Sequence, residues 1–189
     1  MTLSLIWHVL YWGWVASEVI VGVATRTKNS TGKVHDRGSL LILWLVIVIS
    51  ITACEWISEA NAPNMFGGGH FLRIAAVSVL VVALVIRWSA IFTLGKSFSS
   101  NVAILDAQQI NRSGLYGFVR HPSYLGLLLV FFAIGLHSRN WLSFAIVLLP
   151  TTTALLYRIH VEEAALLKAF GDDYLTYSKA TKRLVPGLY

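Results

Sequence analysis

The chain has 189 residues, of which 56% are hydrophobic and 13% are charged. This composition excludes an ordinary soluble domain and favours a protein that uses the lipid bilayer as its solvent. The net charge of +6 comes without a basic stripe interleaved with aromatic residues, so we expect contact with lipid headgroups and no nucleic-acid partner.

The apolar residues fall in blocks long enough to cross a bilayer, which takes roughly 20 helical residues. In chain order we expect five transmembrane helices, at residues 3–24, 39–57, 71–94, 122–137 and 141–157. No Lys or Arg precedes the first apolar stretch, which favours a transmembrane helix over a signal peptide. No repeat or long linker interrupts the series. We therefore predict one all-α, polytopic membrane domain over residues 1–189.

The basic residues predict how the helices are oriented. Thirteen of the 15 Lys and Arg residues lie near the end of the third apolar block or after the first, third or fifth block, and the two exceptions are Arg73 and Arg139. Because Lys and Arg are retained on the cytoplasmic side, we expect an outside N-terminus and a cytoplasmic C-terminus. The expected cytoplasmic segments are residues 25–38, 95–121 and 158–189.

Residues 95–121 form a connection much longer than is usual between helices of a compact bundle. Its last part is rich in aromatic and aliphatic residues, which argues against disorder. Pro122 can open the fourth helix, placing Arg120 and His121 at its partially positive N-terminal end. Free amide groups there could hold a polar ligand. An alternative that the spacing leaves open is that Arg120 and His121 anchor the protein to lipid phosphate.

The segment that follows the fifth block is amphipathic and predicts a cytoplasmic helix. Arg158 and Glu162 are four residues apart and share one face of this helix. As a surface pair they would contribute only about 0.3–0.5 kcal/mol. They lie, however, where the helix leaves the bilayer, and charges at that depth are costly unless they are paired or used. We therefore favour a functional role for them.

Other chemistry is not indicated by the sequence. Cys54 is the single cysteine, which excludes an internal disulfide and a cysteine-based metal site. The histidines are scattered without ligand spacing, so we expect no metal. Arg87, near the end of the third block, could snorkel to the interface or face the loop at residues 95–121.

Two motifs carry a family resemblance. The first is Arg120–Gly126 (RHPSYLG); the second comprises Glu162-Glu163, then residues 170–174 (FGDDY) and Tyr177. In this order, separated by a helical hairpin, they resemble the isoprenylcysteine carboxyl methyltransferase family. The likeness covers roughly residues 85–189, whereas the first two helices carry no comparable signature. The broader superfamily includes phospholipid N-methyltransferases and sterol reductases. The resemblance therefore indicates the cofactor-binding half of the protein more specifically than the identity of the substrate.

The resemblance implies methyl transfer from S-adenosylmethionine to the carboxylate of a lipophilic acceptor, for example a prenylcysteine-like one. The cofactor would lie in a cytoplasm-facing pocket, and the acceptor would enter from the membrane between helices. Arg158 would hold the acceptor carboxylate as the catalytic and substrate-binding residue. The residues carried over as cofactor-binding, the first four through backbone groups, are Gln108, Gln109, Ile110, Asn111, Tyr116, His121, Pro122, Ser123, Tyr124 and Glu162.

Physical chemistry agrees with this assignment. A sulfonium donor is cationic, so methyl transfer to an anion neutralises both partners, and a water-poor site speeds that step. A carboxylate is already ionised at pH 7, so the site must supply alignment but no general base. Two alternatives stay open: a phospholipid or small-lipid N- or O-methyltransferase of the same superfamily, and a non-enzymatic membrane transporter or assembly factor. The sequence does not indicate an oligomeric state.

Overall fold

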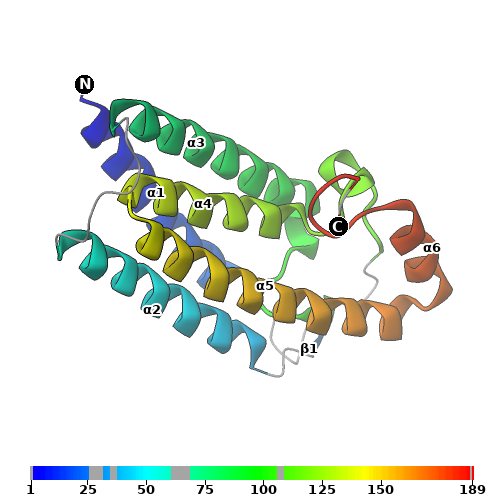
Figure 1. The fold of residues 1–189 in the computed structure, drawn as a ribbon. Helices are drawn as coiled ribbons and strands as arrows, with labels where there is room; N and C mark the ends of the chain where they lie inside the picture. The colour runs from blue at the N-terminus through cyan, green and yellow to red at the C-terminus, as the bar shows by residue number, and fades with distance from the viewer. Residues whose placement is uncertain (1, 26–31, 35–37, 61–68, 106–108, 188) are drawn as a thin grey trace.

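The computed structural model describes the chain except for residues 1, 26–31, 35–37, 61–68, 106–108 and 188 (Figure 1). Six α-helices dominate the described residues: α1 Leu3–Ala24, α2 Ser39–Glu59, α3 Gly69–Leu94, α4 Pro122–Ser138, α5 Trp141–Phe170 and α6 Asp172–Ala180. Two short 3-10 helices, η1 Gly95–Ser97 and η2 Gly114–Gly117, and two three-residue strands, β1 Gly32–Val34 and β2 Ala103–Leu105, lie between them.

The prediction of an all-α polytopic membrane protein is confirmed. Four helices, α1, α2, α3 and α5, are long and apolar enough to cross a membrane, and α4 is a shorter apolar helix of 17 residues. Helices suit the bilayer because every backbone polar group along them is satisfied internally. The helix expected after residue 157 is a direct continuation of α5, which stays helical through Pro150 to Phe170. A positive φ of 52° at Gly171 then separates α5 from α6.

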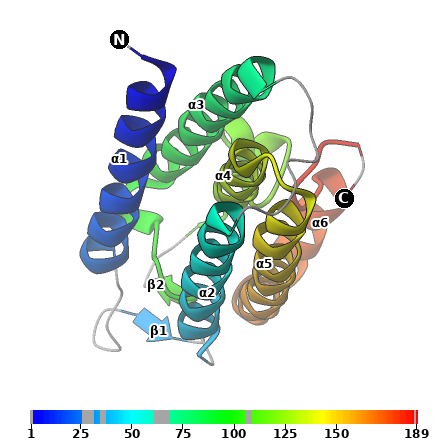
Figure 2. The same cartoon turned by 60° about the vertical axis from the view of Figure 1, so that its left-hand side comes forward.

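Helix α4 lies at the centre of the bundle, between α3 and α5, while α2 packs against α5 and α1 against α3 (Figure 2). The α3–α4 contact is close because Gly126 has no side chain: a Cβ there would lie 2.9 Å from the N and Cα atoms of Arg87. Small residues are typical of such contacts between membrane helices. The first turn of α5 is capped by Asn140, whose Oδ1 accepts hydrogen bonds from the backbone amides of Leu142 and Ser143.

The described parts of the three segments predicted to be cytoplasmic lie at one end of the bundle. The end of α1, the start of α2, the end of α3, the start of α4 and all of α6 meet there (Figure 1). Strands β1 and β2 pair in antiparallel fashion, with Lys33 opposite Ile104, and so join two of the three segments. The cytoplasmic assignment itself remains a prediction.

Candidate functional site

A cavity opens at this end of the bundle and encloses about 1040 Å³, part of it open to solvent. Helices α1 to α5 and the segment around residues 97–104 contribute to its wall. Six of the residues predicted to form the site line it: Tyr116, His121, Ser123, Tyr124, Arg158 and Glu162. Residues from three separate parts of the sequence are thus brought together around one cavity.

The other described residues among those predicted do not line the cavity. Gln108 lies outside the described residues, and Gln109, Ile110 and Asn111 are not part of the cavity lining. The side chain of Asn111 donates to the carbonyl of Thr93 at 3.1 Å, so it ties the loop to the end of α3. Pro122 is buried as the first residue of α4 and does not line the cavity.

Arg158 is held rigidly in the cavity wall, where only 2% of the residue is exposed. Its Nε donates to the hydroxyl of Tyr124 at 3.0 Å, one terminal nitrogen donates to the hydroxyl of Ser39 at 2.9 Å, and the other donates to the carbonyl of Ser100. These partners come from α4, α2 and the loop after α3. The planar guanidinium therefore has a fixed orientation in the wall of the cavity.

Arg158 and Glu162 are linked through Tyr124. The Tyr124 hydroxyl, which accepts from Arg158, donates to Oε2 of Glu162 at 2.6 Å. The side chain of Glu162 is 31% exposed, so one carboxylate edge stays accessible from the cavity. The imidazole of His121 stacks on the ring of Tyr124 with 5.6 Å between centroids. Its Nδ1 lies 3.9 Å from Oε2 of Glu162.

Glu163 ties the C-terminal segment to the start of α4. One of its carboxylate oxygens accepts from Nε of Arg120 at 2.9 Å, and the other accepts from Nε of Arg183 at 2.9 Å. The Nε2 atom of His121 lies 3.4 Å from the same carboxylate. The backbone amide of Arg120 also donates to the carbonyl of Lys182 at 2.7 Å. The side chain of Arg120 is only 10% exposed, which argues against the lipid-anchor alternative for this residue.

The backbone of Tyr116 is held by a second contact from the C-terminal region. The hydroxyl of Tyr177, on α6, donates to the backbone carbonyl of Tyr116 at 2.8 Å. Burial raises the pKa of Tyr177 to about 12 and also raises the pKa of Tyr116. Both hydroxyls therefore stay protonated at neutral pH and act as hydrogen-bond donors.

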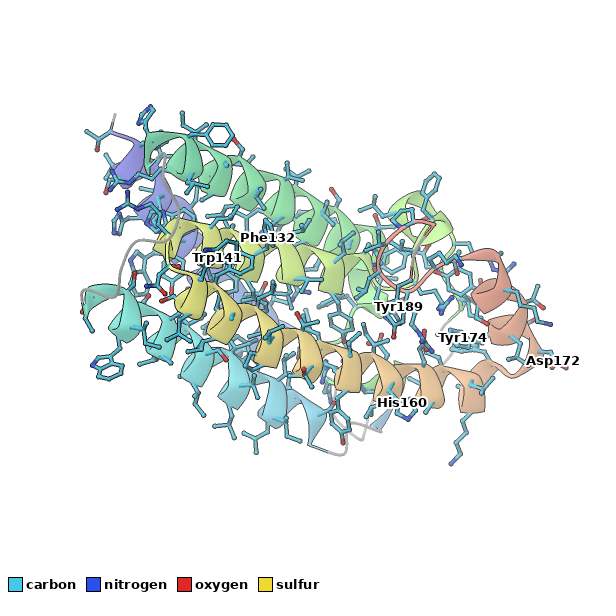
Figure 3. The ribbon with its side chains drawn as sticks, viewed as in Figure 1. Phe132, Trp141, His160, Asp172, Tyr174 and Tyr189 are labelled. Carbon is cyan, nitrogen blue, oxygen red and sulfur yellow. The ribbon has the colours of Figure 1, made fainter. Side chains whose placement is uncertain are left out.

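The C-terminus also closes over this end of the molecule. The carbonyl of Tyr189 accepts from the backbone amide of Leu184 at 2.8 Å, and its ring lies 5.2 Å from the guanidinium carbon of Arg183. Figure 3 shows Tyr189 beside the start of α4, while His160 and Asp172 point away from the bundle. Neither His160 nor Asp172 lines the cavity, and both are exposed. The described residues contain no cluster of His, Cys, Asp or Glu that could hold a metal.

Sequence reasoning missed an ion pair between α1 and α3 that lines the same cavity. Arg87 donates through Nε and a terminal nitrogen to the two carboxylate oxygens of Glu18, at 2.9 and 2.8 Å. The indole of Trp14 donates to the same carboxylate at 3.2 Å. Arg87 therefore does not snorkel to the interface, and it faces the loop at residues 95–121 through Phe98, whose ring lies 5.8 Å from the guanidinium carbon. The signal for Glu18 was present, because a lone acid inside a membrane span is costly unless it is paired or functional.

Another part of the lining is apolar and faces the interior of the bundle. Side chains of α1, α2 and α4 form this part of the wall, namely Trp14, Val21, Leu43, Ile47 and Leu127. The cavity thus combines a polar region near the chain segments at the bundle end with an apolar region between the helices. Such a site can bring a polar cofactor and a lipophilic molecule together.

Comparisons with known proteins identify the family of this chain. The model of the isoprenylcysteine carboxyl methyltransferase (ICMT) family matches residues 76–168. A protein-S-isoprenylcysteine O-methyltransferase of Schizosaccharomyces pombe is 32% identical over 156 residues, which cover 76% of this chain and 66% of that protein. Methanethiol S-methyltransferase 1 of Bradyrhizobium diazoefficiens is 40% identical over 72 residues, which cover 38% of this chain and 24% of that protein.

A solved structure shares the fold. The eukaryotic intramembrane Ras methyltransferase ICMT superposes with a TM-score of 0.64 at 23% sequence identity, covering 77% of this chain and 52% of that one. The chain therefore spans between about a quarter and two thirds of the length of these relatives. The family match includes the first motif and Glu162-Glu163 of the second. This integral membrane protein belongs to the isoprenylcysteine carboxyl methyltransferase family.

Proposed function

We propose that the protein is a membrane methyltransferase that moves a methyl group from S-adenosylmethionine to the carboxylate of a lipophilic, prenylcysteine-like acceptor. The observation that carries this proposal is the position of Arg158, a buried guanidinium in the wall of a cavity whose inner part is apolar. A lipophilic tail can pack between the helices while its acidic end meets Arg158. The names of the relatives support the same reaction class.

On the acceptor side, the work of the site is alignment. Arg158 donates to two neutral partners through its terminal nitrogens, the hydroxyl of Ser39 and the carbonyl of Ser100. A carboxylate that enters the cavity can replace these partners, because charge-assisted and bidentate hydrogen bonds are the stronger ones. The carboxylate is ionised at pH 7 and is itself the nucleophile, so the residues around it need not remove a proton.

On the cofactor side, the residues present fit S-adenosylmethionine. The accessible carboxylate of Glu162 can accept hydrogen bonds from hydroxyl or ammonium groups, and Tyr116, His121 and Ser123 extend the polar lining beside it. When bound, the cofactor supplies a methyl group on a cationic sulfonium. The chain's own contribution is to hold the cofactor next to Arg158 through Tyr124 and to keep water out with its apolar lining.

We also propose that this end of the bundle faces the cytoplasm, with the N-terminus outside. The distribution of Lys and Arg supports this orientation. It would place the cavity mouth in the compartment from which a soluble, charged cofactor can enter.

A second candidate, methylation of a small thiol, is suggested by the methanethiol S-methyltransferases among the relatives. We place it second for two reasons. Those relatives match about 72–85 residues of this chain, whereas the isoprenylcysteine enzymes match up to 174 residues. A small thiol also has no use for a guanidinium held like that of Arg158 or for the apolar lining of the cavity.

The proposal can be tested on detergent-purified protein with S-adenosylmethionine labelled in its methyl group. The reaction would be run with an N-acetyl S-prenyl cysteine, with methanethiol and without acceptor. We expect label in the prenylcysteine product that mild base releases as methanol, because esters hydrolyse and thioethers do not. Base-stable label in methanethiol would favour the second candidate. Absence of cofactor binding in calorimetry would favour a non-enzymatic protein.

A further inference from the structure

The ion pair between Glu18 and Arg87 lines the cavity but has no part in the chemistry described above. Glu18 belongs to α1 and Arg87 to α3, and their side chains are 9% and 7% exposed. Burying two charges carries a large desolvation cost, and apolar residues of similar volume often stabilise a protein at least as well. A buried pair in a cavity wall therefore indicates a role beyond joining two helices.

The guanidinium of Arg87 is fixed as firmly as that of Arg158. Glu18 accepts two parallel hydrogen bonds from it, at 2.9 and 2.8 Å. The ring of Phe98, another lining residue, lies 5.8 Å from the guanidinium carbon. On the other side, Gly126 allows the backbone of Arg87 to approach α4 closely. The orientation of its N–H bonds toward the cavity is thus set by α1, α3 and α4 together.

Arg87 has hydrogen-bonding capacity that these contacts do not use. A guanidinium carries five N–H donors and no acceptor. Two of the five donate to Glu18, and a third makes a long contact of 3.3 Å with the carbonyl of Ser123. Among the described residues, no other acceptor is found for Arg87. The remaining donors belong to a side chain that lines the cavity.

The two cavity arginines flank the same turn of α4. Arg87 contacts the carbonyl of Ser123, and Arg158 contacts the hydroxyl of Tyr124, the next residue. Both arginines also line the same cavity, so a molecule that fills it is in reach of both guanidinium groups.

We propose that Arg87 is a specificity-determining residue that donates to a neutral carbonyl oxygen of the acceptor, such as the amide carbonyl of an N-acyl amino acid, while Arg158 holds the carboxylate. This inference rests on the proposed function. Because guanidinium groups only donate, the partner must be an oxygen acceptor. Glu18 already neutralises the charge of Arg87, so a second anion there would be buried without its own cation, whereas a neutral carbonyl would not.

The test compares two acceptors that differ only at this oxygen. One is an N-acetyl S-prenyl cysteine; the other is the S-prenyl mercaptopropionic acid that lacks the acetamido group. The kcat and KM for both would be measured in wild type, in Arg87→Lys, and in the paired apolar variant Glu18→Leu/Arg87→Met. We expect both variants to reduce the ratio of kcat/KM for the amide acceptor over the shortened one at least tenfold, mainly through KM.

A matched control is Tyr11→Phe, which removes a different contact of α1, the part-buried 3.4 Å hydrogen bond to Glu55, away from the cavity. Its ratio of kcat/KM for the two acceptors should equal that of wild type.

If the Glu18–Arg87 pair only held the helices together, kcat/KM would fall by the same factor for both acceptors. If the ratio of kcat/KM for the two acceptors were unchanged in the variants, or if only S-adenosylmethionine affinity fell, the role given to Arg87 would be wrong while the proposed function would still stand. Wild-type protein that methylated neither acceptor would overturn the proposed function as well. If the variant Glu18→Leu/Arg87→Met does not fold, the ratio measured in Arg87→Lys, which retains the charge, still tests the inference.

Discussion

The hydroxyl of Tyr124 connects Arg158 to Glu162, accepting from the former at 3.0 Å and donating to the latter at 2.6 Å. If Arg158 serves the acceptor and Glu162 the cofactor, this single hydroxyl sets the position of one relative to the other. Positioning of reacting groups is the main contribution we expect from the site, because the acceptor carboxylate needs no activation.

Tyr124→Phe should therefore lower turnover more than it lowers affinity. The ring and its stacking on His121 are retained, while both hydrogen bonds are lost. A lost hydrogen bond to a charged group typically costs about 1.5–3 kcal/mol, which corresponds to a tenfold to hundredfold effect. Steady-state kinetics with both substrates varied would separate kcat from KM. A tenfold rise in either KM with kcat unchanged would contradict the positioning role.

Two neighbouring carboxylates should respond differently to neutralisation. Glu162→Gln should weaken S-adenosylmethionine binding about tenfold or more in calorimetry, because Glu162 presents an accessible carboxylate to the cavity. Glu163→Gln should mainly lower the thermal stability, because Glu163 is bound by Arg120 and Arg183 and joins the C-terminal segment to α4. Asp172→Asn, an exposed carboxylate outside the cavity, is the control for both measurements. The same effect from Glu162→Gln and Glu163→Gln would mean that the two residues share one role.

The packing of α3 on α4 predicts a specific stability loss. Gly126→Ala would place a Cβ 2.9 Å from backbone atoms of Arg87, so one of the two helices must shift. Overpacking of this kind typically costs about 1–3 kcal/mol. Thermal unfolding in detergent should show a lower midpoint. Gly13→Ala is the matched control, because a Cβ at Gly13 meets no atom within 4 Å. Equal midpoints for the two variants would show that the close contact is not maintained in the membrane protein.

Features that depend on neighbouring residues were predicted from the sequence, whereas contacts between residues far apart in the sequence were not. The bounds expected for the first four helices agree with α1 to α4 to within about two residues, because length and hydropathy are local properties of a membrane span. Helix α5 instead continues to Phe170, well beyond the end expected at residue 157. The spacing of Arg158 and Glu162 placed both on one side of α5, and both line the cavity. The partnership of Glu18 and Arg87 joins residues 69 positions apart, so no periodicity reveals it.

The role of Glu163 shows the same limit. Its sequence neighbourhood does not distinguish it from Glu162, because consecutive helical residues differ only in the direction of their side chains. The contacts with Arg120 and Arg183 depend on the return of the C-terminal segment to the start of α4. That return is carried by backbone hydrogen bonds, which every sequence can make and which therefore leave no compositional signal.

The orientation in the membrane can be tested with cysteine labelling. In a Cys54→Ala background, which removes the buried native thiol, a cysteine would be introduced at Lys179 or at Phe71. Both positions are exposed. The first belongs to α6 and the second to the start of α3, and these lie at opposite ends of the bundle (Figure 1). We expect an impermeant reagent applied to intact cells to label the cysteine at position 71 and not the one at position 179. The reverse pattern would show that the cavity opens to the outside.

The last prediction is that Arg158 acts on the acceptor, so that Arg158→Lys lowers turnover with little change in cofactor affinity. Lysine keeps the positive charge but lacks the planar fork that presents parallel donors to a carboxylate. It also cannot reproduce the contacts with Tyr124, Ser39 and Ser100 that hold the guanidinium in place. We expect kcat at saturating cofactor to fall at least tenfold.

The size of the effect distinguishes Arg158 from an interfacial anchor, since a lysine would reach headgroup phosphate nearly as well as an arginine. Near wild-type turnover in Arg158→Lys would favour the anchor. A collapse of cofactor affinity in calorimetry would instead place Arg158 in the cofactor site. Lys168→Arg, at an exposed position ten residues further along α5 and outside the cavity, controls for exchanging the two side chains elsewhere on the same helix. Because two hydrogen bonds through Tyr124 connect Arg158 to Glu162, only a loss of turnover that leaves cofactor binding unchanged assigns the guanidinium to the acceptor.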